Sequence, residues 1–180
     1  MTSFMIDAHV DRKVCQDWKN DSTCAFCRII HGELPSTRVF EDDKVVAFLD
    51  ILPLRPGHTL VVPKLHCSRL SELPPEYAAA IGQAVSKVAK ALTQAMQNTA
   101  LNVVCNQEYA QAVPHVHYHI IPAPSFDASA QKRKEFEKAK QKDQRVPFTK
   151  REMHQREFES RSELDDDEGQ DIATKIRARL

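Results

Sequence analysis

The sequence lacks an excess of charge of either sign, since 25 lysines and arginines balance 25 aspartates and glutamates among its 180 residues. This balance excludes a global electric field that would draw the chain to nucleic acid or to an anionic membrane. The first residues hold no apolar stretch of the kind found in secretory signal peptides. No window approaches the ~20 apolar residues of a transmembrane helix. We therefore expect neither nucleic acid nor membrane as a partner, and a cytoplasmic or nuclear location.

The cysteines do not indicate a disulfide framework. The sequence has five of them, an odd number, and without a secretion signal they are better explained as thiols or metal ligands. Two form the pair Cys24-x-x-Cys27, which by itself fits redox chemistry, zinc binding or coincidence. Redox use usually accompanies a thioredoxin-like βαβ pattern, which is not evident here.

Composition divides the chain into three regions. Residues 1–23 form a polar arm, residues 24–124 hold most of the apolar segments, and residues 125–180 form a highly charged, partly helical extension. Such charge runs are usually a solvated surface, although binding of a protein partner is a second role open to this extension.

Hydrophobic patterning predicts an α+β domain within residues 24–124. Apolar residues stepping by three or four after Pro75 predict one long helix that reaches Met96. Runs rich in Val, Ile, Leu and Phe predict five strands in a mainly antiparallel sheet. The expected strands are residues 37–41, 44–50, 58–63, 101–106 and 115–122.

The most informative run contains His115, His117 and His119, at every second position with apolar residues between them. Side chains two apart in a strand point to the same face, so the run predicts a row of three imidazoles. Such a row suits a metal or a phosphate better than it suits a core, because each ring has polar atoms that need partners. One reading makes the imidazoles metal ligands, and the other makes one imidazole a nucleophile toward phosphorus.

This run resembles the His-φ-His-φ-His-φ-φ signature (φ apolar) of the histidine-triad family of nucleotide hydrolases and transferases. Other blocks resemble its Hint-like branch in the same order, while a cupin-like metal enzyme would not explain them. The blocks are residues 24–35, 40–43, 47–51 and 57–64. The resemblance implies the family's α+β fold, a homodimer and a purine nucleotide substrate.

The resemblance also implies catalytic and nucleotide-binding residues. His117 would attack the α-phosphorus and form a nucleotidyl-histidine intermediate, while His119 and His58 would bind the non-bridging oxygens. Asp50 would accept hydrogen bonds from the ribose hydroxyls. The remaining nucleotide-binding candidates, around the base or the phosphate, are Phe26, Ile29, Phe48, Ile51, Asn106 and Gln111.

Some Hint-like proteins bind zinc through a Cys-x-x-Cys pair and two histidines. The matching positions are Cys24, Cys27, His66 and His115. Two thiolates and two imidazoles would form a closed tetrahedral site of the structural type, with no organic cofactor expected. The alternative is two packed thiols beside unrelated histidines.

The resemblance favours a hydrolase of purine nucleoside phosphoramidates, of the adenosine 5′-monophosphoramidase type. Two alternatives stay open: a dinucleoside polyphosphate hydrolase, and a zinc-stabilised nucleotide-binding module with a mainly protein-interaction role. One departure bears on this choice, because Ala112 stands where family members often carry a serine or threonine whose hydroxyl assists the leaving group.

Overall fold

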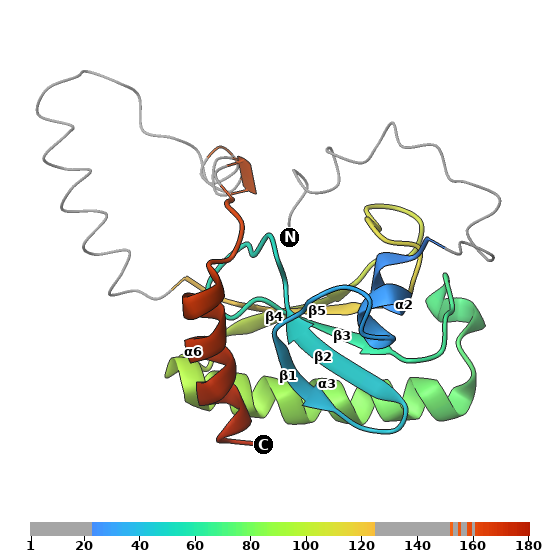
Figure 1. Cartoon of the computed structure of the whole chain (residues 1–180), viewed down its shortest axis with the longest axis horizontal. Helices are drawn as coiled ribbons and strands as arrows, with labels where there is room; N and C mark the ends of the chain where they lie inside the picture. The colour runs from blue at the N-terminus through green and yellow to red at the C-terminus, as the bar shows by residue number, and fades with distance from the viewer. Residues whose placement is uncertain (1–22, 125–151, 153–154, 156–157, 160) are drawn as a thin grey trace, which may run out of the picture.

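The computed structural model describes residues 23–124, 152, 155, 158–159 and 161–180 (Figure 1). The expected N-terminal arm, apart from residue 23, and most of the first half of the charged extension lie outside these residues. Among the residues described, no helix combines the length and the apolar character needed to cross a membrane.

Five antiparallel strands form one sheet, which confirms the α+β prediction. Their order across the sheet is β1-β2-β3-β5-β4. In the turn between β1 and β2, the Asp42 side chain accepts hydrogen bonds from the backbone N–H groups of Lys44 and Val45. The strands are β1 (Arg38–Glu41), β2 (Val45–Leu49), β3 (Thr59–Pro63), β4 (Leu101–Cys105) and β5 (Tyr118–Pro122).

The two faces of the sheet carry different side chains. Helix α3 (Pro75–Met96) covers one face, where it packs with Val45, Ala47 and Val61 in the main core. Residues of opposite parity on the same strands, such as Val46 and Phe48, form a smaller core on the other face. The expected helix is confirmed; it ends at Met96 and is capped by Gln97, whose backbone is left-handed (φ 51°).

Strand β5 begins at Tyr118 rather than at His115, so the prediction of a strand over residues 115–122 was too long. Pro63 lies at the end of the neighbouring strand β3 and has no N–H to continue the ladder. The backbone N–H of Val116 instead donates to the carbonyl of Cys67, at 2.7 Å. His119 therefore lies on the strand, while His115 and His117 lie on the segment that leads into it.

The C-terminal helix α6 (Asp166–Arg177) packs on the domain, across the C-terminal half of α3 and beside β1 (Figure 1). The Asp165 side chain caps its first turn by accepting hydrogen bonds from two backbone N–H groups. Ile172 and Ile176 are buried in the main core. This end of the charged extension is thus part of the packed structure.

Candidate active site and metal centre

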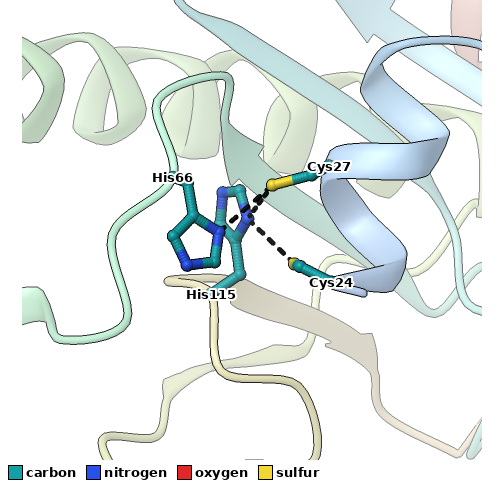
Figure 2. A group of neighbouring side chains, drawn as sticks. All are labelled: Cys24, Cys27, His66 and His115. Carbon is teal, nitrogen blue, oxygen red and sulfur yellow. Dashed lines mark hydrogen bonds between the residues drawn. The ribbon is translucent and has the colours of Figure 1, made fainter. Parts of the chain in front are cut away.

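Four side chains from three segments meet beside helix α2 (Ala25–Ile30) (Figure 2). Cys24 and Cys27 stand at the start of α2, where residues three apart share one face of a helix. His66 comes from the loop after β3, and His115 from the segment before β5. One ligand atom from each residue lies within 4.8 Å of the others. The structure therefore brings together all four predicted metal ligands.

The geometry of this cluster fits a tetrahedral zinc site. Sγ of Cys27 lies 3.1 Å from Nδ1 of His66, and Nδ1 of His115 lies 3.5 Å from Sγ of Cys24 and 3.6 Å from Sγ of Cys27. Zn–S bonds of ~2.3 Å and Zn–N bonds of ~2.0–2.1 Å at tetrahedral angles place sulfur and nitrogen about 3.5 Å apart. The separations therefore suit one ion bound by all four residues.

The two imidazoles are also oriented for metal binding. Nε2 of His115 donates to the carbonyl of Pro63 at 2.8 Å, which leaves Nδ1 unprotonated and facing the sulfurs. Burial lowers the pKa of His115 to about 4, so the ring is neutral near pH 7, although its bond to Pro63 opposes this shift. Nε2 of His66 is buried without a hydrogen-bond partner among the residues described. The polar contact of this ring is made by Nδ1, which faces Sγ of Cys27.

The three histidines predicted to be catalytic, His58, His117 and His119, gather on the face of the sheet opposite α3. His119 pairs with Leu60 across β5 and β3, and His58 lies just before β3 with the same parity as Leu60. The ring centroids are 4.8 Å apart for His117 and His119 and 5.2 Å apart for His58 and His119. The structure therefore divides the triad, with His115 in the metal cluster and His117 and His119 beside His58.

Hydrogen bonds determine which nitrogen of each ring carries the proton. Nδ1 of His117 donates to the carbonyl of His115 at 2.6 Å, so its Nε2 keeps a free lone pair. Nδ1 of His58 accepts from the backbone N–H of Leu54, so Nε2 of His58 donates to Nδ1 of His119 at 3.0 Å. The remaining proton of His119 is then on Nε2. The site thus offers one nucleophilic nitrogen and one N–H donor.

All three rings are neutral near pH 7. Burial is the main cause that lowers the pKa of His58 to about 3 and that of His119 to about 2, and both values include a smaller contribution from electrostatic repulsion between each ring and its neighbours. Burial also lowers the pKa of His117, although its hydrogen bond to the His115 carbonyl opposes the shift. A neutral imidazole is the form that can attack phosphorus.

Asp50, the predicted ribose ligand, follows β2 and lies beside these histidines. Its Oδ1 accepts from the backbone N–H of Leu52 at 3.0 Å, and its Oδ2 lies 3.4 Å from Nδ1 of His58. The carboxylate is 17% exposed, and this burial raises its pKa.

The predicted base-binding residues separate into two groups. Phe26 and Phe48 are buried in the smaller core with their ring centroids 5.6 Å apart, and Phe26 is also 5.0 Å from the ring of His117. Ile29 packs against the same cluster. Ile51 lies apart from them and is 66% exposed. Phe26, Phe48 and Ile29 therefore form an apolar surface next to the proposed nucleophile, with Ile51 outside it.

Asn106 and Gln111 hold the loop between β4 and β5. Nδ2 of Asn106 donates to the carbonyl of Ala110, and the buried Gln111 donates to the carbonyls of Ser68 and His115. Gln111 also accepts from the backbone N–H of Glu108. These bonds position the segment that carries His115, and a direct contact of either side chain with nucleotide stays a prediction.

Ala110 has a left-handed backbone conformation, with φ 58°. Alanine is strained there, whereas glycine is not. We expect Ala110→Gly to raise the free energy of unfolding by about 0.5–1 kcal/mol, the part of the ~1–2 kcal/mol strain that remains after the added flexibility of the unfolded chain. Chemical denaturation measures this change. Ala89→Gly, in the middle of helix α3, is a control in which the same substitution should lower the free energy of unfolding. If Ala110→Gly also lowers it, the assignment of strain at Ala110 is wrong.

Sequence reasoning missed one charged group near this site. The positive charge of Arg161 lowers the pKa of both Asp50 and His58, although more than a hundred residues separate it from them in sequence. Nothing in the local pattern around Arg161 distinguishes it from the other cations of the extension. The helical spacing of Ile172 and Ile176 could have shown that the chain returns to the core nearby.

Comparison with known proteins adds to this geometry. The HIT domain profile matches residues 31–125, just over half of the sequence. The chain belongs to the HIT family. The HIT profile includes His58, Asp50, His66 and the histidine triad, while Cys24 and Cys27 precede it.

Two curated relatives are similar to the HIT region. "Protein hit" of Bacillus subtilis is 44% identical over 101 residues, covering 55% of this chain and 70% of that protein. The adenosine 5′-monophosphoramidase hnt1 of Schizosaccharomyces pombe is 42% identical over 104 residues, covering 57% of this chain and 76% of that protein.

A solved structure supports the same family. It is that of a Zn-bound histidine triad family protein from Mycobacterium smegmatis, which is 27% identical and has a TM-score of 0.62. The match covers 87% of this chain and 92% of that one. HIT proteins similar to this chain therefore include one with bound zinc.

Proposed function

We propose that this chain hydrolyses purine nucleoside phosphoramidates through a nucleotidyl-histidine intermediate on His117. The observation that carries this proposal is the hydrogen bond from Nδ1 of His117 to the His115 carbonyl, which leaves Nε2 as a free nucleophile in a neutral ring. The similarity to a protein named adenosine 5′-monophosphoramidase supports this choice of substrate.

The proposed reaction has two steps. Nε2 of His117 forms a bond to the α-phosphorus while the bond from phosphorus to the amine nitrogen breaks, and the leaving amine takes up a proton from solvent. Water then attacks the same phosphorus, gives up a proton to solvent, breaks the bond to Nε2 and releases the nucleoside monophosphate. The N–H of His119 donates to a non-bridging oxygen and stabilises the charge that develops there.

A turnover panel tests the substrate assignment. Purified protein is assayed with adenosine phosphoramidate, diadenosine tri- and tetraphosphate and a nucleotidyl sugar. We expect the highest kcat/KM for the phosphoramidate. Preference for a dinucleoside polyphosphate would instead assign a phosphate leaving group, and AMP binding without turnover of any compound would favour a nucleotide-binding module.

Ala112 lacks the hydroxyl that a serine would place at this position. If such a hydroxyl assists the leaving amine, Ala112→Ser should raise kcat for the phosphoramidate.

His58 acts in this scheme through His119. Its Nε2–H donates to Nδ1 of His119 and so keeps the proton of His119 on Nε2, the atom proposed to face the phosphoryl oxygen. We expect His58→Ala to lower kcat by roughly 10–1000-fold, as loss of one preorganised donor does. Steady-state kinetics measure this effect, with the exposed His31→Ala as the control. Wild-type kcat in His58→Ala would show that His58 is only a structural residue.

We also propose that zinc occupies the cluster of Cys24, Cys27, His66 and His115 as a structural ion. The four protein ligands complete a tetrahedron, so no position is left for a substrate or a reactive water. Bound there, zinc would supply a link between helix α2, the loop after β3 and the start of the triad segment. Its place beside Phe26 would keep the apolar surface next to His117.

We propose a homodimer formed through strand β4. This strand is an edge of the sheet, and Val103 on it is 40% exposed. An open antiparallel edge can pair with the same edge of a second copy and satisfy its free backbone groups. Sedimentation velocity should give twice the mass of one chain, and Val103→Lys should shift the protein toward the monomer. A wild-type protein that sediments as a monomer at micromolar concentration would contradict this proposal.

A further inference from the structure

The segment before α6 lies against the loop that follows Asp50. The backbone N–H of Leu164 donates to the carbonyl of Ile51 at 2.8 Å, and Leu164 also packs against Gly169 of α6. A Cβ added to Gly169 would lie 3.1 Å from Leu164, so the absence of a side chain permits this close approach. Figure 1 shows the segment passing beside the loop between β2 and β3. Because α6 is held in the core, the segment is fixed at this position.

Arg161 is carried by this segment and has its own restraints. Its Nε donates to the carbonyl of Phe158 at 2.9 Å, and its guanidinium lies 3.8 Å from the centre of the Phe158 ring. Three residues of extended chain span at most about 10 Å, so the bond of Leu164 to Ile51 keeps the Arg161 backbone within about that distance of Leu164. The guanidinium is thus restrained by its contacts with Phe158, on a segment that is anchored against the loop following Asp50.

The charge of Arg161 opposes an effect of burial on Asp50. Burial raises the pKa of this carboxyl, and the positive charge of Arg161 lowers it. In the described part of the chain, the polar groups facing the Asp50 carboxylate are the Leu52 N–H, which favours the ionised form, and His58, which is neutral. Arg55 and Arg161 both lower the pKa of His58 and so help to keep it neutral. Among the residues that the structure describes, Arg161 is thus the charged group that favours an ionised Asp50.

An ionised carboxylate can accept hydrogen bonds from two ribose hydroxyls at once, whereas a protonated one must use an oxygen as a donor. We propose that Arg161 is a positioning residue for ribose, and that through Asp50 it makes the site prefer ribonucleotides to nucleotides without the 2′ and 3′ hydroxyls. This inference rests on the proposed function, because it requires that Asp50 bind the ribose. It assigns part of the nucleotide specificity to the C-terminal extension.

Calorimetric titration with AMP and with 2′,3′-dideoxy-AMP tests the inference on the full chain. Wild type should bind AMP at least about tenfold more tightly, since hydrogen bonds to a charged acceptor are lost with the hydroxyls. Arg161→Gln should weaken AMP binding about three- to tenfold and leave dideoxy-AMP binding unchanged. Arg161→Lys keeps the charge and should restore most of the preference.

Two controls separate this role from a structural one. Arg179→Gln removes an exposed arginine that bonds the carbonyl of Lys175 on α6, and it should bind both nucleotides like wild type. Asp50→Asn removes the carboxylate through which Arg161 is proposed to act. In this variant, Arg161→Gln should cause no further change in the affinity for AMP. Thermal denaturation of each variant verifies that it is folded.

The outcomes distinguish this inference from the proposed function. If wild type binds neither nucleotide, the proposed function is overturned and the inference with it. If wild type prefers AMP and Arg161→Gln keeps the same preference, the inference alone is overturned. An equal loss of affinity for both nucleotides also overturns it, because Arg161 would then act on the phosphate or on the fold rather than through Asp50.

Discussion

Replacing His117 with alanine should reduce phosphoramidate turnover to background while AMP still binds within a few-fold of the wild-type affinity. The substitution removes the nitrogen that we propose attacks phosphorus, and removal of a nucleophile deletes the covalent route. Asp50 and the apolar surface of Phe26 and Phe48 remain to hold ribose and base. Single-turnover kinetics and calorimetric titration of the purified variant measure the two effects separately.

A matched control uses His31, which is exposed, caps the C-terminal end of α2 and belongs to neither histidine group. His31→Ala should keep wild-type kinetics, which shows that loss of an imidazole alone is harmless. Since His117 is buried, thermal denaturation of His117→Ala must also show a folded protein. Substantial residual hydrolysis by folded His117→Ala would rule out His117 as the nucleophile.

The second large effect concerns stability. Cys27→Ser should lose bound zinc and lower the melting temperature by about 10 °C, because a structural metal supplies folding free energy and ~1 kcal/mol shifts the melting point of a chain of this size by ~2–4 °C. Below its own melting transition the variant should still turn over substrate, since His117 is not a metal ligand. Elemental analysis and thermal denaturation of protein purified without added metal measure both changes.

Cys67 provides the control for this experiment. It lies outside the metal cluster, and its Sγ donates to the carbonyl of Arg69. Cys67→Ser should therefore keep its zinc and nearly all of its stability. A wild-type protein that contains no metal and is as stable as the zinc-loaded form would show that Cys24 and Cys27 are only packed thiols.

Most of the sheet could be predicted because local pattern and tertiary packing agree there. Residues of β2 and β3 alternate between the two cores, and both strands are buried throughout, which gives the apolar runs seen in the sequence. The predicted N-terminal limit of β5 was wrong because the start of this strand depends on its neighbour β3. Pro63 lies more than fifty residues away in sequence, and its missing N–H ends the ladder with β5.

The candidate site was predictable to the extent that short motifs contain its residues. The Cys-x-x-Cys pair and the histidine run indicate which residues meet, and the structure places all four predicted zinc ligands together. Sequence could not show the proton positions on His117 and His119, because backbone carbonyls and neighbouring rings determine them. It also could not show the place of Arg161, which depends on the contact of Leu164 with Ile51.

The most direct test of the central proposal is the stereochemical course of hydrolysis at the α-phosphorus. An adenosine phosphorothioamidate of one configuration is hydrolysed in isotopically labelled water, and the configuration of the product is determined. Attack by His117 followed by attack by water comprises two displacements at one phosphorus, each with inversion. We therefore expect net retention of configuration. Net inversion would mean that water attacks the substrate directly, and it would contradict a nucleotidyl-histidine intermediate.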